Sequence, residues 1–75
     1  MMNRMRLVSS MMASAGYDPA NRVLEIEFAT GAVYHYFDVP LDVYQDLVDA
    51  ASQGRFFHDH IRHSFAFQRV EVSAQ

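Results

Sequence analysis

The chain has 75 residues, no cysteine and a formal net charge of −3, and 51% of its residues are hydrophobic while 20% are charged. This length allows one domain with a single small core, and the composition is that of a globular rather than a disordered chain. The lack of cysteine excludes disulfide bridges and thiolate zinc sites, and an acidic average argues against strong non-specific nucleic-acid binding. We therefore expect one cytoplasmic, monomeric domain over residues 1–75, frayed at 1–5 and 73–75.

The first expected strand covers residues 7–17, with a bulge where small residues gather at 14–16. Arginines followed by an apolar stretch imitate a secretion signal here, but Ser9 and Ser10 interrupt the stretch, and cleavage would remove the strand. No run reaches the ~20 apolar residues that a membrane helix needs, so no membrane partner is expected. The two serine hydroxyls are expected to satisfy turn backbone rather than to act as nucleophiles, because no elbow motif accompanies them.

Two strands joined by a turn come next. The turn is Asp18-Pro19-Ala20-Asn21, which is typical of type I because aspartate accepts hydrogen bonds from the backbone ahead and proline fixes φ. Residues 22–28 then alternate in polarity, as a half-buried strand does. The buried face of this strand is expected to carry Leu24, Ile26 and Phe28.

The turn after Phe28 allows two registers. A two-residue loop ending at Gly31 would place His35 opposite Ile26, inside the core. A three-residue loop over residues 29–31 would pair Ile26 with Tyr34 and leave His35 facing water or the glutamates of the neighbouring strand. We favour the three-residue loop, because it requires a positive φ only at glycine.

The hydrophobic period changes after Pro40, which suits the first position of a helix because it has no amide to donate. Apolar residues then recur at three- and four-residue steps, which predicts a helix with Leu47 on its inner stripe. Asp42, Asp46 and Asp49 fall on the opposite side, and we interpret them as a solvated acidic face.

A second helix and a last strand complete the predicted fold. Ser52 can cap the helix, which runs through residues 55–62, and a strand over residues 65–72 follows with Phe65 and Phe67 in the core. The prediction is an α+β domain in β-β-β-α-α-β order, with a small antiparallel sheet of about four strands and two helices packed on one side. The inner residues should form one core: Leu24, Ile26, Phe28, Tyr34, Tyr36, Leu47, Phe57 and Ile61.

Ordered signatures spread over nearly the whole chain resemble those of the KTSC domain. They are Ser9-Ser10, Gly16-Tyr17-Asp18, Leu24, Phe28, Gly31, Tyr34, Tyr36, Val39-Pro40, Val43, Leu47, Ala50, Ser52, Gly54, Phe57 and Ile61. The family is named for a small domain at the C-terminus of some bacterial lysyl-tRNA synthetases, and it also occurs as free-standing proteins. The resemblance implies an RNA-binding or other nucleic-acid-binding role. Members often carry lysine where this chain has Gln53, so one phosphate-binding charge is missing.

Three histidines near Asp59 have the composition of a metal site. His58 and His60, however, are about 200° apart on a helix, so these side chains cannot converge with His63 on one ion. We interpret them as solvated histidines beside arginines. No catalytic site, metal or cofactor is expected, and the chain is predicted not to be an enzyme.

The charges are polarised along the chain. Seven acids against Arg22 give −6 over residues 18–49, whereas three arginines against Asp59 give +2 over residues 50–70. We predict a phosphate-binding site at the start of the second helix, where free amides and the helix dipole meet a guanidinium. Its predicted residues are Gly54, Arg55, Arg62 and Arg69.

Two classes of partner stay open. The first is RNA or another nucleic acid, bound through these arginines. The alternative is a basic protein docked on the acidic face of the first helix. Tyr34 and Tyr36 could in principle stack on bases, but the preferred register places them in the core.

Overall fold

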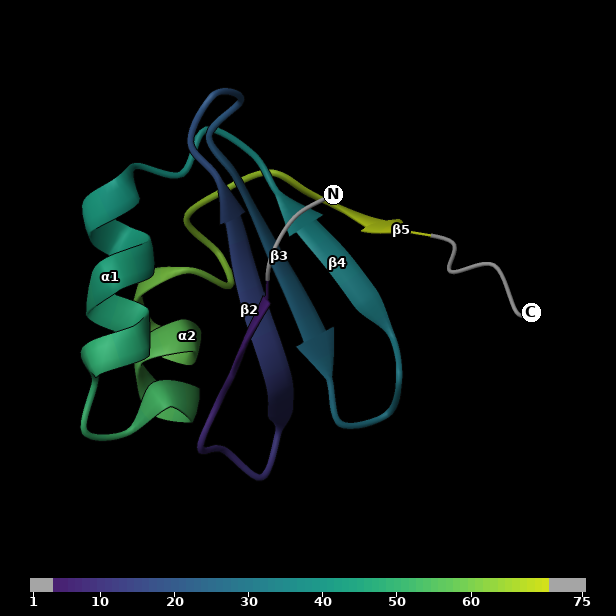
Figure 1. Ribbon diagram of the computed structural model, residues 1–75, viewed down its shortest axis with the longest axis vertical. Helices are drawn as coiled ribbons and strands as arrows, with labels where there is room; N and C mark the ends of the chain where they lie inside the picture. Colours follow the sequence, from purple (N-terminus) through teal and green to yellow (C-terminus); the bar gives the residue numbers. More distant parts are fainter. Residues whose placement is uncertain (1–3, 71–75) are drawn as a thin grey trace.

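The computed structural model describes residues 4–70 and shows a five-stranded antiparallel sheet with two helices on one side of it (Figure 1). The five strands stand side by side in the order of the sequence. They are β1 (Arg4–Arg6), β2 (Met12–Asp18), β3 (Val23–Phe28), β4 (Val33–Tyr36) and β5 (Phe67–Val70), and the helices α1 (Leu41–Asp49) and α2 (Gln53–His60) lie between β4 and β5 in the chain. The α+β class and the element order are confirmed.

The strand count is a correction, because a strand that was not predicted precedes the others, and the predicted strand over residues 7–17 begins only at Met12. Residues 4–6 form β1 and pair with β2, so the expectation that residues 4 and 5 are frayed is wrong. The chain turns between the two strands at Ser9, whose Oγ accepts hydrogen bonds from the backbone N–H groups of Met11 (3.1 Å) and Met12 (3.3 Å). The expected backbone role of this hydroxyl is therefore confirmed. The register shift lies between Met12 and Ser14, slightly earlier than predicted. The predicted frayed residues 1–3 and 73–75 lie outside the described residues.

Both predicted turns are present. Asp18 Oδ1 accepts hydrogen bonds from the N–H groups of Ala20 (3.0 Å) and Asn21 (3.3 Å). Gly31 has a φ of +95°, and Ile26 pairs with Tyr34, so the three-residue loop is confirmed. This register places His35 opposite Glu25, on the outer face of the sheet and away from the helices.

Replacing Gly31 with valine is expected to destabilise the protein by about 1–2 kcal/mol, because a β-branched residue disfavours a positive φ. Apart from its chain neighbours, no atom lies within 4 Å of a Cβ built at this position, so the cost comes from the backbone and not from a clash. Urea denaturation measures the loss, with Ala29→Val in the same exposed loop as the control. Equal stability of Gly31→Val and the wild type would contradict the left-handed turn.

The core lies between the sheet and the two helices. Leu24, Ile26, Leu47 and Ile61 have no exposed surface, and Phe57 and Tyr36 are almost fully buried, as predicted. Phe28 and Tyr34 are only partly buried and pack against this core. The prediction missed the buried residues of the N-terminal segment and of the connection into α1, which are Leu7, Met12, Ala15 and Val39.

The helix boundaries follow their caps. Ser52 Oγ accepts a hydrogen bond from Arg55 N (3.3 Å), which confirms the predicted cap of α2. Pro40 is the N-cap of α1 and not its first helical residue, because its ψ of 151° is still extended. The α2 helix ends at His60, since Ile61 already departs from helical geometry.

The last strand is shorter and more exposed than predicted. β5 stands at the edge of the sheet farthest from the helices (Figure 1). Phe65 packs against the core, but Phe67 is 56% exposed, so its assignment to the core is wrong. The helices do not reach far enough across the sheet to cover this end. The predicted strand residues 71 and 72 lie outside the described residues.

Candidate nucleic-acid interface

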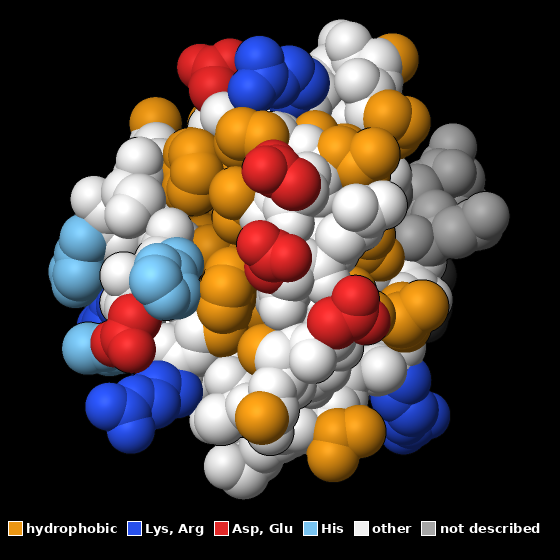
Figure 2. Space-filling model, turned by 90° about the vertical axis from the view of Figure 1, so that its left-hand side faces the viewer, with side chains coloured by type: hydrophobic (Ala, Val, Ile, Leu, Met, Phe, Trp, Pro, Cys, Tyr) orange, Lys and Arg blue, Asp and Glu red, His pale blue; other side chains and the backbone are white. Residues whose placement is uncertain are grey.

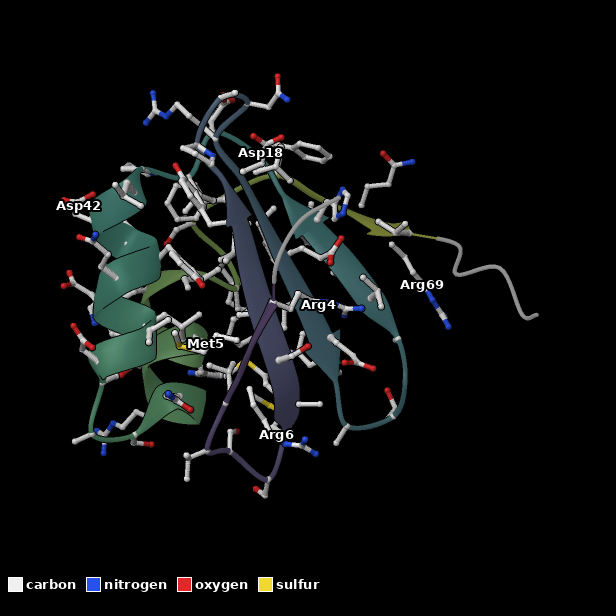
Figure 3. The ribbon with its side chains drawn as sticks, viewed as in Figure 1. Arg4, Met5, Arg6, Asp18, Asp42 and Arg69 are labelled. Atoms are coloured by element: carbon white, nitrogen blue, oxygen red, sulfur yellow. The ribbon has the colours of Figure 1, made fainter. Side chains whose placement is uncertain are left out.

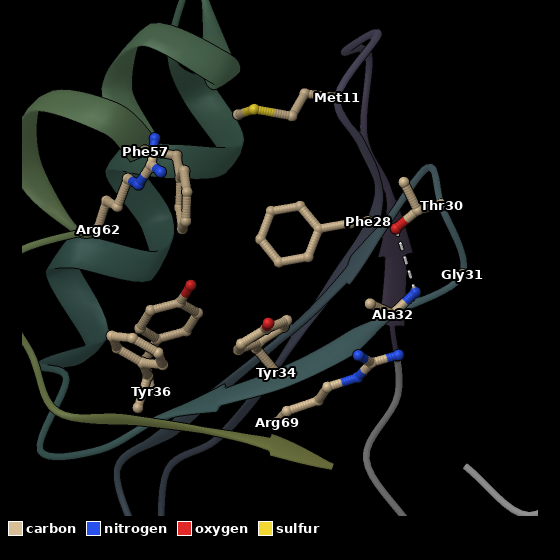
Figure 4. A pocket seen from close by; sticks show the side chains of 11 residues that line it. Met11, Phe28, Thr30, Gly31, Ala32, Tyr34, Tyr36, Phe57, Arg62 and Arg69 are labelled. Atoms are coloured by element: carbon tan, nitrogen blue, oxygen red, sulfur yellow. Dashed lines mark hydrogen bonds between the residues drawn. The ribbon is translucent and has the colours of Figure 1, made fainter. Parts of the chain in front are cut away.

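An open groove of about 820 Å³ lies on the helix side of the sheet, between the end of α2 and the strands β4 and β5 (Figure 4). The middle of this face, including Leu24 and Ile26, is buried, whereas the groove remains accessible. Its volume falls within the range of about 300–1,000 Å³ that is typical of ligand sites. Five aromatic side chains line it, namely Phe28, Tyr34, Tyr36, Phe57 and Phe67.

The aromatic rings form one connected cluster. The ring of Phe67 lies 5.9 Å from that of Tyr34 and 5.6 Å from that of Tyr36, measured between centroids. Tyr34 contacts Phe28 at 5.5 Å, and Tyr36 contacts Phe57 at 5.6 Å, both edge to face. The floor of the groove is thus fixed by mutual packing, and its most exposed ring is Phe67.

Two arginines lie on opposite sides of these rings (Figure 4). Arg62 follows the C-terminal end of α2, and Arg69 is on β5, where it pairs with Tyr34 across the strands. Within residues 4–70 neither guanidinium takes part in an ion pair. No acidic residue belongs to the described lining, so the groove is a positively charged aromatic surface.

The tyrosines add hydroxyl groups to this surface, and both phenol oxygens point into the groove (Figure 4). Burial, reinforced by the neighbouring Tyr34, raises the pKa of Tyr36 to about 12. At neutral pH this phenol is therefore protonated and can donate a hydrogen bond. The groove thus offers a ligand both the guanidinium of Arg62 and the phenol of Tyr36, which suit anionic and polar groups.

The structure divides the four predicted site residues into separate places. Arg62 and Arg69 share the groove, whereas Gly54 lines a smaller hollow of about 460 Å³ that also includes Ser9 and His58. Arg55 lines neither of these two hollows. Its side chain is 83% exposed, and its Nε lies 3.5 Å from Asp59 Oδ2, one turn further along α2. The start of α2 therefore does not join Arg62 and Arg69 in one site.

The histidine-rich segment is arranged along the surface of α2. His58 Nδ1 lies 3.3 Å from Asp59 Oδ1, and this hydrogen bond, followed by the charge of Arg55, lowers the pKa of the carboxyl group. The ring of His60 packs at 4.7 Å from that of Phe56. Across residues 4–70, no three histidine or acidic side chains lie close enough together to hold a metal ion.

Gln53 has a structural role that the sequence did not reveal. Only 8% of it is exposed, its Oε1 accepts a hydrogen bond from Val8 N (2.7 Å), and its Nε2 donates one to Val48 O (3.0 Å). The side chain therefore ties the loop after β1 to the last turn of α1. Both ends of the Gln53 amide group are thus occupied by hydrogen bonds within the fold.

The remaining charges lie away from the groove. Arg4 pairs with Glu25 (3.2 Å) and Glu27 (3.4 Å) across the outer face of the sheet, where His35 Nε2 also lies 2.8 Å from Glu25 Oε1. Acidic side chains form a stripe beside hydrophobic ones on the helix side of the molecule (Figure 2). Asp42 on α1 and Arg69 on β5 lie at opposite sides of the structure (Figure 3). Neither helix in residues 4–70 has the length and hydrophobicity needed to span a membrane.

Comparisons with known proteins agree with this fold. The family model of the KTSC domain matches residues 8–65. An uncharacterized protein of Stutzerimonas stutzeri is 49% identical over 57 residues, which cover 76% of this chain and 80% of that protein. A lysine–tRNA ligase of Nostoc sp. is 36% identical over 61 residues, which cover 81% of this chain and 11% of that enzyme. The crystal structure of a KTSC domain protein from Yersinia pestis has a TM-score of 0.91 and 39% identity, covering 95% of this chain and 100% of that one.

Proposed function

The chain belongs to the KTSC domain family, and on that premise we propose that it is a non-enzymatic accessory module that binds RNA or another nucleic acid. The observation that carries the proposal is the pair Arg62 and Arg69, which flank one open groove with no acidic residue in its described lining. Guanidinium groups bind phosphates through paired hydrogen bonds, and phosphate contacts supply most of the affinity of non-specific nucleic-acid binding.

Relatives and side-chain chemistry support the same function. The related segment of the Nostoc protein is a small part of an enzyme that is named for its action on tRNA, where an accessory RNA contact would be useful. The hydroxyl of Ser9 is engaged by two backbone N–H groups, which leaves it poorly suited to nucleophilic attack. A binding role therefore fits the chain better than a catalytic role that uses Ser9 as a nucleophile.

Affinity for single-stranded RNA should be modest, with a Kd of about 100 μM at physiological salt, because the chain as a whole is acidic. Two phosphate contacts predict a slope of about −1.4 in log K against log salt, which is a loss of about sevenfold between 50 and 200 mM. The double variant Arg62→Gln/Arg69→Gln should bind at least tenfold more weakly at low salt and lose most of this slope. Fluorescence anisotropy of a labelled ten-nucleotide RNA measures both quantities.

Arg55→Gln is the matched control, because this arginine is also exposed to solvent but lies outside the groove. It should leave the affinity within about twofold of the wild type. If Arg55→Gln abolishes binding while the double variant retains it, the phosphates bind at the start of α2 and the groove is not the site. If the wild-type protein binds no RNA at low salt, the proposed function is wrong.

The alternative function is a protein-interaction module. The observation that favours it is the exposed acidic face of α1, formed by Asp42, Asp46 and Asp49, which runs beside hydrophobic side chains (Figure 2). Such a surface suits a basic, amphipathic segment of another protein. Replacing the three aspartates with asparagine should weaken the binding of such a partner. The same change should leave RNA binding unchanged or slightly stronger.

A further inference from the structure

An exposed phenylalanine at the edge of the sheet requires an explanation. Phe67 is 56% exposed, although it lies on the same face as the core and opposite Tyr36 across the strands. Because strand residues alternate between faces, Arg69, two residues after Phe67 on β5, lies on that face too, opposite Tyr34. An aromatic ring and a guanidinium thus stand next to each other over a floor of aromatic side chains.

This arrangement matches the chemistry of an unpaired base. Base faces stack on aromatic rings, and they do so with little dependence on sequence. The rings of Phe67 and Tyr34 are held by neighbours at 5.6 and 5.5 Å, so they form a fixed platform and need no rearrangement before a base binds. Arginines on both sides of the platform can hold the phosphates that precede and follow the stacked base.

A double helix does not fit the same description. In a duplex each base face is covered by its neighbours in the stack, and only groove edges and the backbone are exposed. A duplex could contact Arg62 and Arg69 through its phosphates, but it could not use the rings between them. The aromatic floor therefore distinguishes unpaired from paired nucleic acid, and the arginines alone do not.

We infer that the groove is a binding site for unpaired bases of single-stranded nucleic acid, with Phe67 and Tyr34 as the stacking surface and Arg62 and Arg69 as the flanking phosphate contacts. The inference rests on the proposed function and names its ligand class. These four residues come together as one site only in the folded state, because they belong to β4, β5 and the segment after α2. Two of them, Phe67 and Arg69, lie beyond the residues matched by the family model.

The test compares a ten-nucleotide single-stranded RNA with a ten-unit abasic backbone that has the same number of phosphates, and with the same strand annealed to its complement, which has twice as many. Each is titrated against the full chain in 50 mM salt, with tyrosine fluorescence as a readout, since the chain contains no tryptophan. The single strand should bind about tenfold more tightly than the abasic backbone, which corresponds to about 1.4 kcal/mol. The duplex should bind more weakly per strand than the single strand and should not quench tyrosine.

Variants of Phe67 separate stacking from apolar contact. Phe67→Leu keeps apolar bulk but removes the ring, and should weaken binding of the single strand severalfold without changing binding of the abasic backbone. Phe67→Tyr keeps the ring and should retain wild-type affinity. Phe37→Leu is the control, because Phe37 is an aromatic residue that contacts His35, on the outer face of the sheet. Since Phe67 is exposed, its variants should keep the thermal stability of the wild type.

The outcomes distinguish this inference from the proposed function. If all three probes bind equally and only the arginine variants lose affinity, the chain binds nucleic acid by phosphates alone and the stacking site is wrong. If none of the probes binds, both proposals are wrong. If Phe67→Leu and Phe37→Leu weaken binding to the same extent, the effect is not specific to the groove, and the inference is overturned.

Discussion

Replacing Leu47 with alanine is expected to destabilise the protein by about 2–5 kcal/mol, because the side chain is fully buried and the cavity left behind cannot collapse completely. Leu47 is the one residue of α1 that is fully enclosed, so it connects this helix to the core. A domain of this length has a total stability of about 4–11 kcal/mol, so the substitution removes a large part of it. Thermal and urea denaturation of the purified variant measure the loss.

Leu41→Ala is the matched control, since it makes the same chemical change at the start of the same helix. Leu41 is 48% exposed, so its replacement should lower the free energy of unfolding by no more than about 1 kcal/mol. Equal stability of the two variants would show that α1 does not pack on the core through Leu47, and would reject the assignment of this helix to the inner layer.

Replacing Gln53 with leucine is expected to destabilise the protein by about 1–3 kcal/mol. The variant keeps the apolar part of the side chain but leaves Val8 N and Val48 O without their hydrogen-bond partner. Amide hydrogen exchange should show faster exchange at Val8, because the loop after β1 is no longer tied to α1.

Gln45→Leu is the control for this prediction, because Gln45 is an exposed glutamine of α1. It should change the free energy of unfolding by less than about 0.5 kcal/mol. If Gln53→Leu is as stable as the wild type, water replaces the lost hydrogen bonds and the side chain does not hold the loop.

Local patterns were enough to predict the middle of the chain. The alternation in residues 22–28 and the glycine of the next turn set the register of β3 and β4, because only the three-residue loop confines the positive φ to Gly31. Ser52 likewise marked the start of α2, since its hydroxyl satisfies a free N–H group of the first turn. These features depend on interactions within a few residues of the chain.

Features that depend on distant contacts were not predicted. β1 has three residues that are all exposed, so no hydrophobic pattern distinguishes it from a frayed terminus. The burial of Gln53 depends on Val8, which is 45 residues away in the sequence. The exposure of Phe67 depends on how far the helices extend across the sheet. Sequence periodicity predicts which face of the sheet a side chain lies on, but it does not predict whether a helix packs over that position.

The candidate site was predicted only in part for the same reason. Arg62 and Arg69 were identified by charge, but they were assigned to the start of α2 together with Gly54 and Arg55. Stacking and core packing were treated as exclusive roles for Tyr34, whereas a half-buried ring at an open end of the sheet can have both. The alternation that places Phe67 and Arg69 on one face was the available signal in the sequence.

The most direct test of the proposed nucleic-acid interface is a chemical-shift titration of the isotope-labelled protein with single-stranded RNA at low salt. The structure predicts that the largest changes occur at the backbone amides of β4 and β5, at Arg62, and at the ring signals of Tyr34 and Phe67. The amides near Asp42 and Asp46 should not move. If excess RNA leaves the groove signals unchanged, or shifts only those around Gly54 and Arg55, the groove is not the binding site.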